Sequence, residues 1–232
     1  MSVLKVFDLS KSFGAEQIFS KVSFEINRGD KVGLIGANGT GKTTLLRCML
    51  GHEAVDGGQV SVPAGETVGY VEQNHQFEDR TLYEELLSGY QDVLSWQEEM
   101  RRLEEAVSEE KEPAAIDGLM RQYAKVTAQF EHAGGYEYES NIRRVADGLG
   151  FSADDFDRAI STFSGGQKTR IALAKALLRK PDYLFLDEPT NHLDIGMVEW
   201  LEEYLREYSG GILIISHDRY FLDRVTDRIL EL

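Results

Sequence analysis

A glycine-rich segment between an apolar run and a helical pattern constrains this chain more than any other feature. Residues 36–43 read Gly-Ala-Asn-Gly-Thr-Gly-Lys-Thr, which fits the pattern G-x-x-x-x-G-K-[ST]. The run before it, residues 31–35, is predicted to be a strand buried on both faces, and residues 42–50 are predicted to be a helix. Glycines let backbone amides turn inward around phosphate oxygens, and the helix N-terminus adds positive potential. The segment therefore predicts a phosphate-binding loop.

The side chains of this loop are suited to a nucleoside triphosphate with Mg²⁺. Lys42 can neutralise charge on the β- and γ-phosphates, and the Thr43 hydroxyl can bind the metal ion. The predicted nucleotide-binding residues of the loop are Gly36, Asn38, Gly39, Thr40, Gly41, Lys42, Thr43 and Thr44.

A second buried-strand pattern ends in two carboxylates. Residues 183–186 read Tyr-Leu-Phe-Leu, and Asp187 and Glu188 follow directly. Asp187 at the end of such a strand can hold Mg²⁺, directly or through water. Glu188 can polarise an attacking water molecule. Alone, these residues favour an ordinary strand ending in an acidic turn. Together with the phosphate loop they predict a nucleoside triphosphatase.

Length and composition limit the class of protein. The chain has 232 residues, which suggests one large domain or one domain with an insertion. It has 25 basic and 40 acidic residues, a net charge of −15, which argues against broad non-specific binding of nucleic acid but leaves room for a local basic patch. No apolar run approaches the roughly 20 residues of a transmembrane helix. The single cysteine, Cys48, fits a reducing compartment, so a cytoplasmic location is expected.

The middle of the chain carries a different pattern. Apolar residues recur at spacings of 3 and 4 on both sides of Pro113, as expected for two consecutive helices with one seam each. The first seam consists of Val93, Trp96, Met100, Leu103 and Val107, and the second of Ile116, Leu119, Tyr123, Val126 and Phe130. A short connection between them predicts an antiparallel hairpin inserted over residues 80–135, with a first helix running from about 82 to 110. Residues 80–131 hold 12 acidic and 6 basic side chains.

The sequence Phe-Ser-Gly-Gly-Gln at residues 163–167, which follows the phosphate loop and precedes the Asp187-Glu188 strand, resembles the ATP-binding cassette (ABC) ATPases. The resemblance implies an α/β fold of the P-loop type over residues 1–232. It implies an N-terminal antiparallel β subdomain and a helical subdomain that carries the inserted hairpin. It also implies ATP and Mg²⁺ as ligands.

The same resemblance implies a role for further residues. Gln73 and His217 correspond to side chains that sense Mg²⁺ and the γ-phosphate. Phe13 corresponds to an aromatic that stacks on adenine, although a half-buried aromatic beside a turn would look the same. The implied catalytic residues are Glu188, His217, Gln73 and Lys42, and the implied metal-binding residues are Thr43, Gln73 and Asp187. The residues implied to act on the ATP of a second cassette are Ser164, Gly165, Gly166, Gln167 and Asp194.

Two further segments narrow the resemblance to the F-type branch, the ABC-F proteins. Residues 187–194 read Asp-Glu-Pro-Thr-Asn-His-Leu-Asp, and residues 216–223 read Ser-His-Asp-Arg-Tyr-Phe-Leu-Asp. In ABC-F proteins the place of the hairpin holds an arm that touches the ribosome. The resemblance implies the first of two paired cassettes, cut from a longer chain and weakly active as an ATPase on its own, with the ribosome and a second cassette as partners. The alternatives are the ATP-binding subunit of a membrane transporter and an ATP-gated module that binds nucleic acid or protein.

Overall fold

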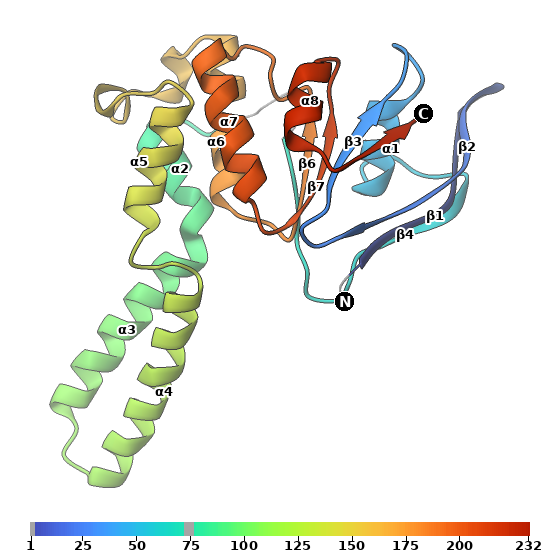
Figure 1. Cartoon of the computed structure of the whole chain (residues 1–232). Coiled ribbons are helices and arrows are strands. Elements are labelled where there is room, and N and C mark those ends of the chain that lie inside the picture. Colours follow the sequence, from blue (N-terminus) through green and yellow to red (C-terminus); the bar gives the residue numbers. More distant parts are fainter. Residues whose placement is uncertain (1–2, 72–76) are drawn as a thin grey trace.

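The computed structural model describes residues 3–71 and 77–232, and it contains two sheets with helices around them (Figure 1). The strands are β1 (Val3–Phe13), β2 (Glu16–Asn27), β3 (Lys31–Ile35), β4 (Gly57–Ser61), β5 (Val68–Tyr70), β6 (Tyr183–Asp187), β7 (Gly211–Ile215) and β8 (Arg228–Glu231). The α-helices are α1 (Lys42–Met49), α2 (Leu82–Leu87), α3 (Gln91–Glu109), α4 (Pro113–His132), α5 (Tyr138–Gly148), α6 (Gly165–Leu178), α7 (Ile195–Glu207) and α8 (Arg219–Val225). The 3₁₀ turns are η1 (Ser88–Tyr90), η2 (Ala153–Asp155) and η3 (Ile160–Thr162).

The larger sheet is parallel and has the strand order β5-β6-β7-β3-β8. Its central strands are buried on both faces, and successive side chains enter two different cores. Leu184 and Leu186 of β6 pack into the core formed with the helices α2, α5, α6, α7 and α8. Tyr183 and Phe185 pack into the opposite core, which α1 and the smaller sheet complete. The predicted α/β class follows from this arrangement and is confirmed.

The smaller sheet is antiparallel, with the order β2-β1-β4. Its strands are longer than the stretches of alternation at residues 4–7 and 22–26. The alternation breaks off early because the pairing of β1 and β2 contains register shifts. One shift lies around Asp8, whose φ is 48°. Each shift moves the following side chains to the other face, so the period of two is lost from the sequence although the strand continues.

Helices α3 and α4 form the arm, a pair of antiparallel helices that projects away from the sheets (Figure 1). The seam between them is thin: Val93, Leu103 and Phe130 are buried, and the other seam residues are half-buried. One polar contact crosses it, from the Tyr123 hydroxyl to Glu104 Oε1 at 2.8 Å. Pro113 occupies the first turn of α4, as its fixed φ favours.

The single first helix predicted over residues 82–110 is wrong. The chain forms α2, then the 3₁₀ turn Ser88–Tyr90, and only then α3. Glycine at position 89 is a weak helix former, and the Ser88 hydroxyl donates to the Glu85 carbonyl at 2.6 Å instead of leaving it to the helix ladder. Tyr90 is buried beside the ring of Tyr138, so packing against α5 fixes the bend. Among residues 3–71 and 77–232, no helix is both long enough and apolar enough to cross a bilayer.

Candidate nucleotide-binding site

The phosphate loop lies between β3 and α1, as the sequence predicts. Gly39 and Gly41 have φ values of 84° and 95°, in the left-handed region that favours glycine. Gly41 also touches the smaller sheet, because a Cβ there would come 2.3 Å from Ile18 Cγ2. The smaller sheet therefore supports the loop from outside, and Gly41 has both a conformational and a steric reason to be glycine.

Lys42 is 8% exposed and folds back onto the loop. Its Nζ donates to the carbonyl oxygens of Gly36 and Ala37 at 3.0 and 2.9 Å. These carbonyls hold the ammonium group at the loop. A phosphate group would replace these neutral acceptors with negatively charged ones, which bind an ammonium group more strongly.

The Thr43 hydroxyl donates to Asp187 Oδ2 at 2.8 Å, joining the first turn of α1 to the end of β6. Burial raises the pKa of Asp187, while the hydrogen bond from Thr43 and the charge of Lys42 act in the opposite direction. A hydroxyl and a carboxylate side by side fit Mg²⁺, which is commonly held by one or two protein oxygens together with phosphates. Among the residues that the structure describes, no group of three or more His, Cys, Asp or Glu side chains could hold a metal ion without such help.

Glu188 follows Asp187 in a left-handed conformation, with φ of 51°. Its backbone N–H donates to the Ile215 carbonyl at 2.8 Å, which ties it to the end of β7. Its Oε2 accepts from the His217 N–H at 3.3 Å. Its Oε1 is buried and accepts no hydrogen bond, although His217 Nε2 lies 3.4 Å away. Glu188 and His217 therefore lie together at the edge of the sheet where Asp187 ends β6, and a carboxylate in this position can act as a general base toward water.

Strand order explains how these groups meet. The loop follows β3, Asp187 ends β6, and His217 comes two residues after β7, which lies between the other two strands. The carboxyl ends of parallel strands share one edge of a sheet, so residues 144 positions apart come into contact there.

The segment of residues 163–167 begins α6. Ser164 Oγ accepts from the Gln167 N–H at 3.3 Å, and Gln167 Oε1 accepts from the Ser164 N–H at 2.9 Å, a capping box. Asp194 caps the N-terminus of α7 with a single hydrogen bond, which it accepts from the Met197 N–H at 3.0 Å. Ser164, Gly165 and Asp194 are exposed, as residues that act on a partner must be.

The remaining predicted residues have simpler surroundings. Phe13 ends β1 and is 50% exposed; Lys11 Nζ lies 4.7 Å from the centroid of its ring, so one face is available for stacking. Asn38 is exposed, Thr44 is half-buried on α1, and the Thr40 hydroxyl donates to the Ala37 carbonyl at 3.0 Å. Gln73 lies outside the described residues.

Two features of the site were missed from the sequence. His192 packs on α6, because a Cβ on Gly166 would lie 3.2 Å from His192 Cγ. The glycine pair at 165–166 was the only signal that something approaches this turn closely. A cavity also lies beside Asp187 and Glu188; it is lined mainly by apolar side chains and is bordered by Arg170. Its walls come from distant segments, including Val71, Leu173 and Leu193, and no local pattern marks it.

A buried strand, a glycine loop closed by Lys42 and Thr43, and a carboxylate on a neighbouring strand define a P-loop nucleoside triphosphate-binding protein. The family within this class follows from the similarity of the chain to known protein families. The family model described as ABC transporter matches residues 19–191. The chain belongs to this family and forms its ATP-binding cassette.

Three curated relatives match nearly the whole chain. It is 43% identical over 232 residues to the ATP-binding protein YdiF of Bacillus subtilis, 38% over 231 residues to the tylosin resistance ATP-binding protein TlrC of Streptomyces fradiae, and 35% over 223 residues to the energy-dependent translational throttle protein EttA of Mycobacterium tuberculosis. These matches cover 100%, 99% and 96% of this chain but 36%, 42% and 39% of the relatives. The chain thus spans well under half the length of these proteins.

Proposed function

We propose that this chain is the first cassette of an ABC-F protein, which binds and hydrolyses ATP and acts on the ribosome. The observation that carries the proposal is the arm of α3 and α4, inserted between the phosphate loop and the segment of residues 163–167. The names of two relatives support it, because one is a translational throttle protein and the other a tylosin resistance protein. The first name refers to translation and the second to resistance to an antibiotic, the two roles expected of the F-type branch.

In the proposed reaction, one set of residues acts on ATP bound by this cassette. Lys42 and the loop amides bind the phosphates, and Thr43 and Asp187 hold Mg²⁺, which would supply charge neutralisation. Glu188, which follows Asp187 at the end of β6 and lies beside His217, would accept a proton from the attacking water molecule. His217, next to Glu188, would contact the γ-phosphate, and Gln73 is the second predicted sensor of Mg²⁺ and the γ-phosphate.

A second set of residues faces a partner cassette. Ser164, Gly165 and Gly166 form an exposed helix N-terminus, which is a natural anion site and would meet the γ-phosphate bound by the partner. Asp194 lies at the N-terminus of α7, and Gln167 holds Ser164 in place. ATP would therefore favour the closed pair, because it contacts both cassettes only in that state.

The arm is the part of the chain proposed to contact the ribosome, and its acidity is the feature that fits this partner least. It is exposed along most of its length, and its acidic side chains outnumber its basic ones. Affinity for RNA rests mainly on Lys and Arg at phosphates, so an acidic arm favours contacts with ribosomal protein or with few phosphates.

The family also contains ATP-binding domains of membrane transporters, and that function is the second candidate. A co-sedimentation experiment separates the two. The full-length protein with Glu188→Gln, held in its ATP-bound state, should co-sediment with ribosomes when ATP is present. A matched protein whose residues 91–132 are replaced by a short Gly-Ser linker should remain in the supernatant. Enrichment in membranes instead of ribosomes would favour the transporter function, and binding to isolated RNA or protein alone would favour an ATP-gated binding module.

A further inference from the structure

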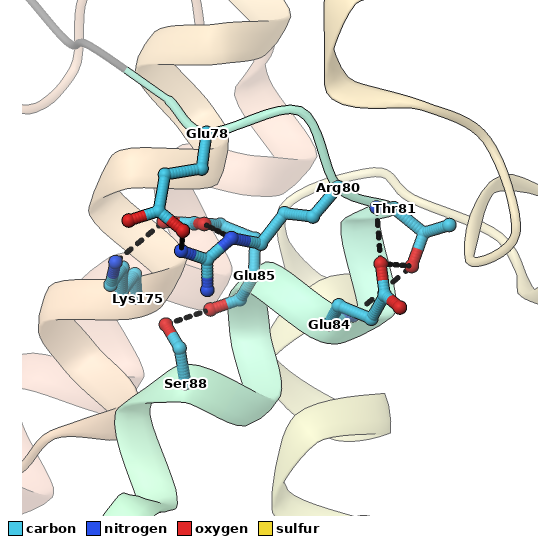
Figure 2. A network of polar contacts seen from close by, with 7 residues as sticks. All are labelled: Glu78, Arg80, Thr81, Glu84, Glu85, Ser88 and Lys175. Carbon is cyan, nitrogen blue, oxygen red and sulfur yellow. Dashed lines mark hydrogen bonds and ion pairs between the residues drawn. The ribbon is translucent and has the colours of Figure 1, made fainter.

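A buried carboxylate that the nucleotide site does not use lies where the arm joins the cassette. Glu85 of α2 has 4% of its side chain exposed and lies between two cations (Figure 2). Arg80 Nε is 3.1 Å from Glu85 Oε2, and Lys175 Nζ of α6 is 2.5 Å from Glu85 Oε1. Arg80 also pairs with the exposed Glu78. A buried carboxylate is stable only with such partners, so Glu85 holds α2 and α6 in one arrangement.

Backbone contacts join the same two parts of the chain. The Leu82 N–H donates to the Arg158 carbonyl, and the Ile160 N–H donates to the Arg80 carbonyl, each at 3.0 Å. Thr81 forms a bridge with Ala159. The paired segment lies directly before Ser164, where α6 begins. The segment that leads into the arm is therefore bonded both to the approach to α6 and, through Lys175, to the last turn of α6.

Apolar packing completes the connection. Leu82 and Leu86 of α2 are fully buried in the same core as Ile171 and Leu177 of α6. Beyond this region, α2 leads through the turn Ser88–Tyr90 into α3. A displacement of the arm thus reaches α2 first, and α2 cannot shift against α6 without separating the Glu85 carboxylate from Lys175.

We propose that Glu85 is a positioning residue that makes the arm and the N-terminus of α6 move as one body, so that a partner bound to the arm controls where Ser164, Gly165 and Gly166 lie. The role in ATP turnover rests on the proposed function; the rigid connection does not. Glu85 touches neither the phosphate loop nor Glu188 in this mechanism, and acts through Lys175 and Arg80.

The test measures the connection directly in the full-length protein. Cys48 is replaced by Ala, and spin labels are placed at Arg121 on α4 and Ser161 before α6, with Ser161 and Glu203 of α7 as a control pair. We expect Glu85→Gln to widen the distance distribution of the arm pair by about twofold and to leave the control pair unchanged, because the ion pairs of Glu85 with Arg80 and Lys175 are lost and neither involves α7. Glu84→Gln is the matched variant: its carboxylate bonds to Thr81 within the start of α2 and does not reach α6 (Figure 2).

Several outcomes would overturn the proposal. A folded Glu85→Gln protein with a native arm-pair distribution would do so, and so would equal widening of both pairs, which indicates general loosening. If Glu85→Gln does not fold, Lys175→Met takes its place, with Lys175→Arg expected to restore the native width. Stimulation of ATP turnover by ribosomes is the second readout: Glu85→Gln should lose it while keeping the basal rate and the KM for ATP. A wild-type protein that ribosomes do not stimulate would contradict the proposed function and leave the distance measurement to decide the connection.

Discussion

The central sheet and the arm are held together in different ways. All five residues of β7 are buried, and its side chains are divided between two cores. The nineteen residues of α3 bury only Val93 and Leu103, and the twenty of α4 bury only Phe130. The nucleotide site, which must hold several groups within hydrogen-bond distance, rests on the fully buried sheet. The two-helix arm with its thin seam can bend or open locally at a lower free-energy cost. The nucleotide site thus lies on the rigid sheet, and the proposed contact with a partner lies on the more deformable arm.

The largest effect is expected at the site itself. Glu188→Gln should lower kcat for ATP by roughly 10²–10⁴-fold, because the amide cannot take the proton, while ATP binding is kept. Single-turnover hydrolysis and equilibrium binding of ATP in the full-length protein would measure the two effects. Turnover near the wild-type rate would show that another group is the base.

The next effect concerns the stability of the central sheet. Leu213→Ala should reduce the free energy of unfolding by about 2–5 kcal/mol, because Leu213 is fully buried and the surrounding strands cannot close the cavity. Urea unfolding of the chain followed by circular dichroism would measure it. A loss below about 1 kcal/mol would mean that the core beneath the loop repacks easily.

The same substitution in the arm should have a smaller and more local effect. Leu103→Ala should speed amide hydrogen exchange in both α3 and α4. Its decrease in the urea midpoint should be less than about half of the decrease caused by Leu213→Ala. Exchange measured by mass spectrometry, peptide by peptide, distinguishes the two. Faster exchange spread over β6 and β7 would contradict the separation of the two regions.

The smallest effect is expected on the surface of the arm. Arg102 Nη2 pairs with Glu99 Oε1 at 2.7 Å on α3, and the side chains are 73% and 34% exposed. Arg102→Ala should change the free energy of unfolding by less than about 0.5 kcal/mol, since exposed pairs are screened and flexible. The affinity of the same variant for ribosomes is a more sensitive measurement. A marked loss of affinity would indicate that Arg102 contacts an RNA phosphate despite the acidity of the arm.

What could be predicted from the sequence was mostly local. The phosphate loop depends on residues 31–50 alone, and the arm seams depend on regular spacing within each helix, so both were visible. Taking the phosphate loop together with Asp187 and Glu188 predicted one nucleotide site, and the hydrogen bond from Thr43 to Asp187 joins the two segments in the structure. The strand order, the bend at Ser88–Tyr90 and the long strands with shifted register depend on tertiary packing, which local patterns do not contain.

Glu85 is the clearest residue that the sequence analysis overlooked. It shares one face of α2 with Leu82 and Leu86, at the spacing of neighbours on a helix, and an acidic residue on an apolar face was the available signal. The signal could not name its partner, because Lys175 is 90 residues away and only the fold brings the two together.

The bridge between Thr81 and Ala159 has a consequence for how this architecture can change. Residues 82–158 form an insertion whose two ends lie side by side. Lengthening an insertion of this kind raises the entropic cost of closing it only slightly. Arms of other lengths or charges could therefore be exchanged between α2 and α5, which pack in the core and stay in place, and under the proposed function the same core would then serve a different partner.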